Sequence, residues 1–200
     1  MTDLPPRSDA EFLEEMKRST ADELRYFSNK GKEERERWVV EEFLKWLGIE
    51  FAKEELRSLE PENKADVAFR DGRFQVKEIT DPDIRRGDEV RTVYERVEAA
   101  KTVEDILGPG LTYDTPPLIN GYELVRKEAE RLTAKYTSSK GMLDLLFYVT
   151  RRGASAIQPQ EVSADEFSIM GWRSISCLIG DRSIILFAGD DAPSFLRIKR

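Results

Sequence analysis

The feature that most constrains the fold is a hairpin signal near residue 71. Residues 66–70 and 73–79 alternate apolar and polar side chains, and Asp71-Gly72 separates them. An Asp-Gly pair between two alternating segments is typical of a two-residue β-turn. The sequence therefore predicts two antiparallel strands, in a register that sets Asp66 opposite Lys77.

The rest of the chain alternates between helical and extended segments. Helices are expected near residues 8–17, 20–29, 32–47, 88–107, 122–136 and from 164 onward. Strands are expected at 49–52 and 143–150, and a second hairpin over 174–188 about Gly180-Asp181. Because hairpins lie among helices, we expect an α/β (α+β) fold, with a mixed central sheet and helices on its faces.

The length of 200 residues suits one domain. We expect a single domain over residues 1–200, built from three parts. These parts are an N-terminal helical extension (1–30), a core (31–150) and a C-terminal hairpin addition (151–200).

The absence of histidine excludes several kinds of catalysis. There is no histidine and only one cysteine, Cys177. Ser-His-Asp and Cys-His nucleophiles are therefore excluded, as are zinc sites built from histidine and cysteine. Proton transfer must use Asp, Glu, Lys, Tyr or metal-bound water.

The same composition bears on location. Cys177 lies in an apolar run and reads as a small buried side chain. No apolar run approaches the ~20 residues that cross a bilayer, and the N-terminus carries no secretory signal. We therefore expect a cytoplasmic protein without membrane contact.

The predicted hairpin gathers polar groups on one face. Alternation sets Asp66, Gln75 and Lys77 on that face and apolar side chains on the other. Carboxylate and amide oxygens suit Mg²⁺, and an ammonium can orient a water or offset charge that develops on a phosphate. The chemistry that this set favours is metal-assisted phosphodiester hydrolysis.

These residues carry a resemblance to a known family. Asp66 followed by Gln75-Val76-Lys77 resembles the D…(D/E/Q)xK motif of the PD-(D/E)XK nuclease superfamily, in its QxK variant. The resemblance implies a restriction-endonuclease-like, nuclease-like core within 31–150. It also implies Mg²⁺ (or Mn²⁺) bound by Asp66 and Gln75, and Lys77 as the residue that orients water. Glutamine replaces the usual acid, and Ala65 stands in place of the variable proline.

The superfamily also has a glutamate on a helix before the motif. Glu36 lies in phase with Val40 and Phe43 on the helix 32–47, so the resemblance assigns it as a further metal ligand and catalytic residue. Glu33 and Glu34 are close rivals. The whole chain is also similar to a group of short uncharacterised bacterial proteins that carry an endonuclease label.

The overall charge of −7 argues against a nucleic-acid partner, because phosphate contacts dominate such binding. Basic side chains nevertheless cluster locally. Two sets would contact nucleic acid, taken to be DNA: a stripe on the helix 122–136 and a pair after the hairpin, namely Lys127, Arg131, Lys135, Arg85 and Arg86. The alternative is a solvated helix held by i,i+4 ion pairs and a plain turn.

Two other functions stay open at this point. The chain would then be a catalytically silent binding or regulatory module that keeps the nuclease fold, or an interaction protein in which Asp66 and Lys77 form only a cross-strand ion pair. Metal binding at Asp66 distinguishes the nuclease from both. The oligomeric state is open, with a homodimer among the options.

Overall fold

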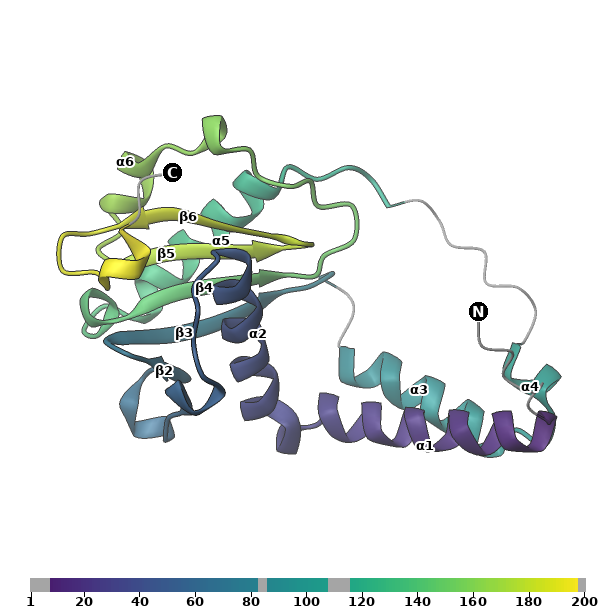
Figure 1. Cartoon of the computed structure of the whole chain (residues 1–200). Helices are drawn as coiled ribbons and strands as arrows, with labels where there is room; N and C mark the ends of the chain where they lie inside the picture. Colours follow the sequence, from purple (N-terminus) through teal and green to yellow (C-terminus); the bar gives the residue numbers. More distant parts are fainter. Residues whose placement is uncertain (1–7, 83–85, 108–115, 198–200) are drawn as a thin grey trace. The chain divides into compact units, whose positions relative to one another are not determined.

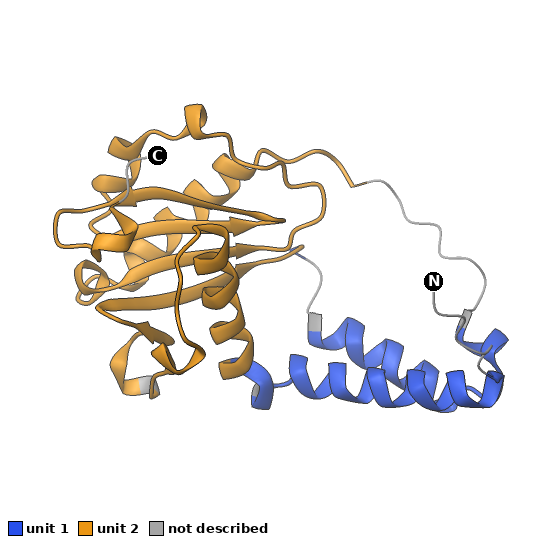
Figure 2. Ribbon diagram, in the orientation of Figure 1, with its two compact units in different colours: residues 1–32, 82–115 blue, residues 33–81, 116–200 orange. Residues whose placement is uncertain are grey.

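The computed structural model describes residues 8–82, 86–107 and 116–197. The chain divides into two compact units (Figure 2). One unit contains residues 1–32 and 82–115, and the other contains residues 33–81 and 116–200. Residues 82–115, which the sequence groups with the core, thus group with the N-terminal helix.

The first unit is helical. It contains α1 (Asp9–Phe27), the 3-10 turn η1 (Asn29–Gly31), α3 (Arg86–Ala99) and α4 (Val103–Leu107). Ser8 caps α1, since the amide N–H of Glu11 donates to Ser8 Oγ at 3.3 Å. The expected break at Thr20 is wrong, because Thr20 Oγ1 donates to the carbonyl of Met16 at 2.9 Å and the helix continues.

The expected helix over 88–107 is in fact two helices. Asp105 Oδ2 accepts the amide N–H groups of Lys101 and Thr102, at 2.9 and 3.0 Å, and so caps the start of α4. These two bonds lower the pKa of the Asp105 carboxyl group. A small apolar cluster closes this unit, built from Val97, Ala100, Ile106, Leu13 and Met16.

The second unit contains a sheet of six strands in the order β1-β2-β3-β4-β5-β6. They are β1 (Leu56–Ser58), β2 (Val67–Phe69), β3 (Gly72–Ile79), β4 (Asp144–Val149), β5 (Ser174–Ile179) and β6 (Arg182–Ala188). The pairs β3–β4 and β4–β5 are parallel, and the other three pairs are antiparallel. The expected mixed sheet is confirmed.

Helices cover both faces of this sheet. Figure 1 shows α2 (Lys32–Trp46) in front of the strands and α5 (Gly121–Lys135) behind them. Side chains on β3 and β4 alternate between the two layers: Phe74 and Leu146 pack in the cluster of α2, whereas Leu145 packs in the cluster of α5. The short helix α6 (Ala164–Ser168) adds Phe167 to the second cluster. The expected α/β class with helices on both faces is therefore confirmed.

Two local expectations need correction. Residues 49–52 are not a strand, and β1 lies instead in the segment 53–64 that shows no strand pattern. The second hairpin does turn at Gly180-Asp181, with Ile179 opposite Arg182 and Gly180 at φ 58°. It is an integral part of the sheet, because β5 pairs with β4.

No described helix is long and apolar enough to cross a membrane.

The second unit also contains five short 3-10 turns: η2 (Lys53–Glu55), η3 (Pro61–Asn63), η4 (Lys140–Met142), η5 (Pro159–Glu161) and η6 (Ser194–Leu196). Cys177 is fully buried, as expected, and burial raises the pKa of its thiol.

A buried carboxylate joins the starts of three strands. Asp144 is 1% exposed and accepts four hydrogen bonds: the amide N–H of Arg73 at 2.8 Å, Ser174 Oγ at 2.8 Å, and Nε and Nη2 of Arg173, the first at 3.0 Å. Arg173 Nη2 also donates to the carbonyl of Asp71 at 3.1 Å. The group thus ties the first residues of β3, β4 and β5 together.

We predict that Asp144→Asn costs about 3 kcal/mol in the free energy of unfolding, because it leaves the Arg173 guanidinium buried without its counter-charge. Urea denaturation measures the change. The matched control is Glu128→Gln, which breaks the Arg131–Glu128 pair on the surface of α5 and should cost less than about 1 kcal/mol. Equal losses in the two variants would contradict this prediction.

Candidate active site

The predicted turn is displaced by one residue. Phe69 pairs with Gly72, so Arg70 and Asp71 are the central residues of the turn. The predicted register is wrong by two positions. Asp66 and Lys77 are therefore not directly opposite one another on the two strands. A slip of two positions leaves every side chain on its predicted face, so the expected shared face survives the correction.

Arg70 explains the displacement. Its φ of 50° lies in the left-handed region, which costs energy for a residue with a Cβ. Its guanidinium offsets that cost: Nε donates to Glu55 Oε2 at 3.0 Å, Nη2 donates to the carbonyl of Glu50 at 2.9 Å, and the group lies 4.7 Å from the centre of the Phe69 ring. The pKa of Glu55 is lowered, first by the amide N–H of Ala52 and then by Arg70.

Asp66 lies one residue before β2, where its carboxylate reaches β3. Its Oδ2 atom accepts the amide N–H of Val76 at 2.9 Å and a hydrogen from the Gln75 side-chain amide. The Lys77 ammonium lies 4.0 Å from the same oxygen. The Asp66 and Lys77 side chains are 12% and 26% exposed, so the carboxylate is held in place yet reachable from solvent.

The Gln75 side chain is a hydrogen-bond donor to Asp66. It is 4% exposed and donates its side-chain NH₂ to Asp66. The amide therefore orients the carboxylate. A half-turn about its terminal bond would bring the amide oxygen to the same place, where it could serve a cation.

Glu36 lies on the sheet-facing side of α2, one turn before the fully buried Val40, and is half-buried. Its neighbours fix where this turn lies: Arg37 Nη1 donates to Ser58 Oγ of β1 at 3.1 Å, and the Trp38 ring is 5.5 Å from that of Tyr148 on β4. The first turns of α2 therefore lie over the face of the sheet that carries Phe74 and Val76. Gln75 and Lys77 alternate with these residues and lie on the opposite face, so the structure does not bring Glu36 onto the face of the Asp66 site.

The rival carboxylates are less well placed. Glu33 and Glu34 are exposed. Glu78 is also exposed, and its Oε1 atom accepts a hydrogen bond from Thr150 Oγ1 at 2.8 Å, as suits the end of a strand. Among the described residues, no three Asp, Glu, His or Cys side chains gather closely enough to hold a metal ion. The residues that the structure brings together are the Asp66 carboxylate, the Gln75 amide and the Lys77 ammonium.

The basic stripe on α5 is partly neutralised. Arg131 donates to both carboxylate oxygens of Glu128, at 2.8 and 2.5 Å, and Lys135 Nζ lies 5.7 Å from the centre of the Tyr136 ring. Lys127 is exposed on the same helix. Arg85 lies outside the described residues, and Arg86 is the first residue of α3, in the helical unit.

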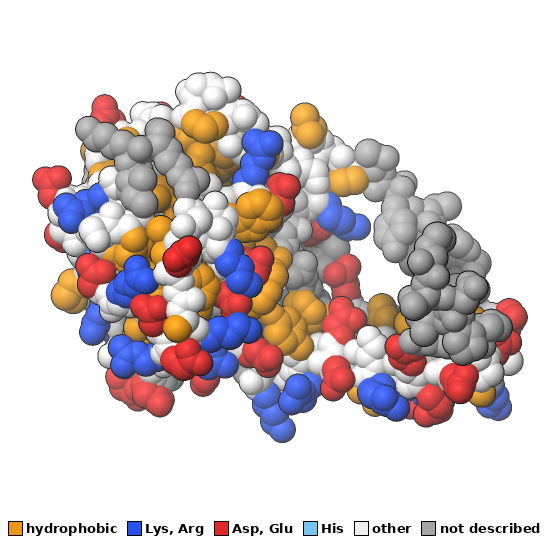
Figure 3. Space-filling model, in the orientation of Figure 1, with side chains coloured by type: hydrophobic (Ala, Val, Ile, Leu, Met, Phe, Trp, Pro, Cys, Tyr) orange, Lys and Arg blue, Asp and Glu red, His pale blue; other side chains and the backbone are white. Residues whose placement is uncertain are grey.

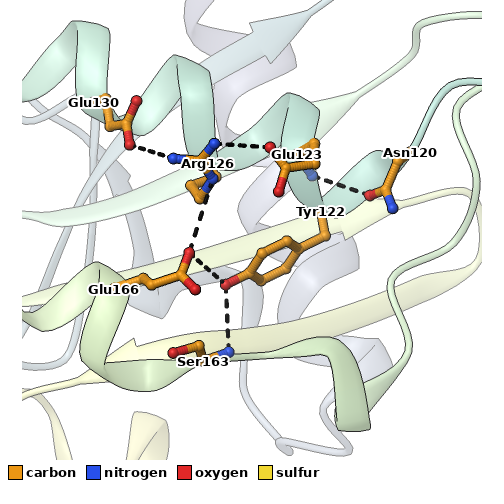
Figure 4. Close-up of polar contacts among 7 residues, drawn as sticks. All are labelled: Asn120, Tyr122, Glu123, Arg126, Glu130, Ser163 and Glu166. Atoms are coloured by element: carbon orange, nitrogen blue, oxygen red, sulfur yellow. Dashed lines mark hydrogen bonds and ion pairs between the residues drawn. The ribbon is translucent and has the colours of Figure 1, made fainter.

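Arg126 forms ion pairs with three glutamates of the second unit. It bonds Glu123 at 2.8 Å and Glu130 at 2.5 Å, and its Nε atom lies 3.8 Å from Glu166 (Figure 4). The Tyr122 hydroxyl donates to the same Glu166 at 3.2 Å, and burial is the main reason that its pKa is raised. This cluster joins α5 to α6, so the Arg126 guanidinium is used within the unit.

Sequence reasoning missed a pair of arginines on the same side of the sheet as Lys77. Arg57 of β1 and Arg73 of β3 both stand beside Ala68 of β2. Their alignment depends on β1, which has only three residues and no alternating pattern. The register of the first hairpin alone indicates that Arg73 shares the face of Gln75 and Lys77.

A family of known sequences matches almost the whole chain. A family described as "Putative endonuclease, protein of unknown function (DUF1780)" matches residues 8–200. The chain belongs to this family. No protein in the curated set of sequences matches this DUF1780 member significantly.

One solved structure shows the same fold. It is a protein of unknown function from Pseudomonas aeruginosa strain PAO1, described as belonging to the monooxygenase superfamily. It is similar to this DUF1780 member with 23% sequence identity and a TM-score of 0.55, over 96% of this chain and 92% of that chain. At this identity the likeness concerns the fold alone.

We predict that Gln75→Glu makes the stability of the protein depend on metal. Without a cation, a second carboxylate beside Asp66 loses a hydrogen bond and adds like-charge repulsion, which should cost about 2 kcal/mol, or roughly 4–8 °C in Tm. Mg²⁺ or Mn²⁺ should restore the Tm, because two carboxylates bind a hard cation well. Thermal unfolding in EDTA and in each metal measures this.

The control is Gln75→Met, which removes the hydrogen-bond donor without adding charge. Its Tm should fall in EDTA and gain little from metal. A Gln75→Glu protein with the same Tm in EDTA and in Mn²⁺ would show that the site does not accept a cation.

Proposed function

We propose that this protein is a metal-dependent nuclease of the PD-(D/E)XK kind, with a restriction-endonuclease-like core. The observation that carries the proposal is the Asp66 carboxylate, which is held by the Val76 amide and the Gln75 side chain with the Lys77 ammonium 4.0 Å away. An acid fixed at the end of one strand and a lysine on the next form the minimal pair for this chemistry. The family description, which names an endonuclease, supports it.

The donor set fits a hard divalent cation. Asp66 would hold Mg²⁺ or Mn²⁺, together with the Gln75 amide oxygen or the Val76 carbonyl. When bound, such an ion polarises a phosphate and lowers the pKa of a water. Asp66 positions the cation through its rigid attachment to β3, and its partial burial keeps the electrostatic attraction strong.

Lys77 completes the site. Its ammonium donates hydrogen bonds to the attacking water and to a phosphate oxygen on which negative charge develops. Its side chain is partly buried beside Asp66, so the charge is held near the reacting atoms. A proton leaves the water for solvent or for the phosphate, since no histidine is present to take it.

The glutamine affects the choice of metal. With the Asp66 carboxylate and a neutral amide, cation binding is weaker than it would be if position 75 carried a second carboxylate. Mn²⁺ binds oxygen and nitrogen sites at least as well as Mg²⁺ and is less demanding of geometry. We therefore expect higher activity with Mn²⁺.

We predict that Asp66→Asn and Lys77→Met each lower cleavage of nucleic acid at least about 100-fold, because each removes a charge that acts in the transition state. Plasmid DNA, labelled oligonucleotides and RNA serve as substrates, in Mg²⁺ and in Mn²⁺. The control is Glu78→Gln, which lies next to Lys77 on the strand but outside the proposed site and should cleave like wild type.

The assay separates three cases. Equal cleavage by wild type and Lys77→Met would mean a contaminant or another site. If no substrate is cleaved and calorimetry detects no metal binding, the chain is the silent module considered above. Loss of cleavage in both site variants, with Glu78→Gln active, supports the nuclease.

A further inference from the structure

A groove lies beside the candidate site, over the three strands β1, β2 and β3. It has a volume of about 410 Å³ and is lined by Arg57, Ser58, Leu59, Ala68, Arg70, Asp71, Gly72 and Arg73. Arg57 pairs with Ala68, and Ala68 pairs with Arg73. The small Ala68 side chain therefore forms the floor, with an arginine on each side.

The two flanking arginines are available to a ligand. Both are exposed, and among the described residues neither guanidinium makes a hydrogen bond or an ion pair. Arg70, in contrast, is held by Glu55. Asp71 is the one acidic residue that lines the groove, against the two arginines Arg57 and Arg73. The groove is thus locally basic on a chain whose net charge is −7.

Two other charged surfaces among the described residues are less favourable for phosphate. On the face drawn in Figure 3, which carries α2, basic and acidic side chains are interspersed over both units. The α5 stripe is weakened by its Glu128 partner. A pair of guanidiniums in a concave surface is a better receptor for phosphate oxygens, because each offers several donors in a fixed plane.

The groove continues the line of the candidate site. Ala68 is two residues after Asp66 on one chain segment, and Arg73 is two residues before Gln75 on the neighbouring strand, all on one face. Two residues of a strand span roughly 7 Å. This is close to the spacing of neighbouring phosphates along one strand. A strand with its scissile phosphate at Asp66 would thus have a nearby phosphate at Arg57 and Arg73.

We propose that this groove binds the sugar-phosphate backbone of the nucleic-acid substrate, through Arg57 and Arg73, without reading the bases. No aromatic side chain lines it, so there is no platform on which a base could stack. Contacts to phosphate position a strand but carry no sequence information. The proposal rests on the proposed nuclease function for its choice of ligand, and binding can be tested apart from cleavage.

The test measures binding of short fluorescein-labelled duplexes and single strands by anisotropy, over a range of salt concentrations. Every protein carries Lys77→Met and is kept in Mg²⁺, so that the substrate stays intact. Arg57→Gln with Arg73→Gln should weaken binding by about tenfold for each arginine, and the slope of log K against log salt should fall by about one for each. Probes of different sequence should bind equally.

Two controls accompany it. The charge-preserving pair Arg57→Lys with Arg73→Lys should keep most of the salt dependence, since both phosphate contacts stay cationic. The pair Arg131→Gln with Lys135→Gln, on α5, removes as many positive charges elsewhere and should change the Kd less than about threefold. Circular dichroism checks that all variants keep the fold.

The proposal is overturned if the Arg57→Gln, Arg73→Gln pair binds as tightly as its parent, if the α5 pair weakens binding instead, or if the parent binds no nucleic acid. Separate assays with native Lys77 decide the nuclease function. Binding that depends on the two arginines, without cleavage by wild type, would support the groove and remove the nuclease. Cleavage that depends on Lys77, with binding that is unchanged when both arginines are substituted, would support the nuclease function and overturn the groove proposal.

Discussion

The sheet depends on the buried ion pair of Asp144 and Arg173. Each of the two buried charges has the other as its partner, and the pair connects the first residues of three adjacent strands. At the same time, Asp144 accepts the amide N–H of Arg73. Further along the same strand, Asp66 accepts the amide N–H of Val76. The strand β3 is therefore held by a carboxylate near its start and by another at its middle, and the second of these is the one that solvent can reach.

The alternation of side chains in the hairpin predicted much of the fold. It set Val67 and Phe74 in one core layer and Gln75 and Lys77 on the other face, as the structure has them. The turn itself was displaced, because the contacts of Arg70 with Glu55 and with the carbonyl of Glu50 outweigh the local preference for Asp-Gly. Those contacts join segments 15 and 20 residues apart, so no turn pattern can reveal them.

Part of the candidate site could also be predicted from the sequence, and part could not. The proximity of Asp66 and Lys77 follows from strand geometry and survives a slip of two positions. The hydrogen bond from Gln75 to Asp66 could not be predicted from strand geometry, because an amide presents either a donor or an acceptor according to its neighbours. The arginines that flank Ala68 were overlooked because their alignment is produced by pairing between strands, one of them the irregular β1. On α5, the Arg131–Glu128 pair follows the i,i+3 spacing, as the ion-paired alternative for this helix expects.

The helical unit has a discontinuous origin, with α1 supplied before the sheet strands of β1 to β3 and α3 supplied after them. During synthesis, α1 emerges with its apolar residues Leu13 and Met16 well before Val97 and Ile106 exist to cover them. The unit can therefore close only after the first half of the sheet has been made. Removal of residues 1–32 would likewise not excise a domain, but would deprive α3 of the helix against which it packs.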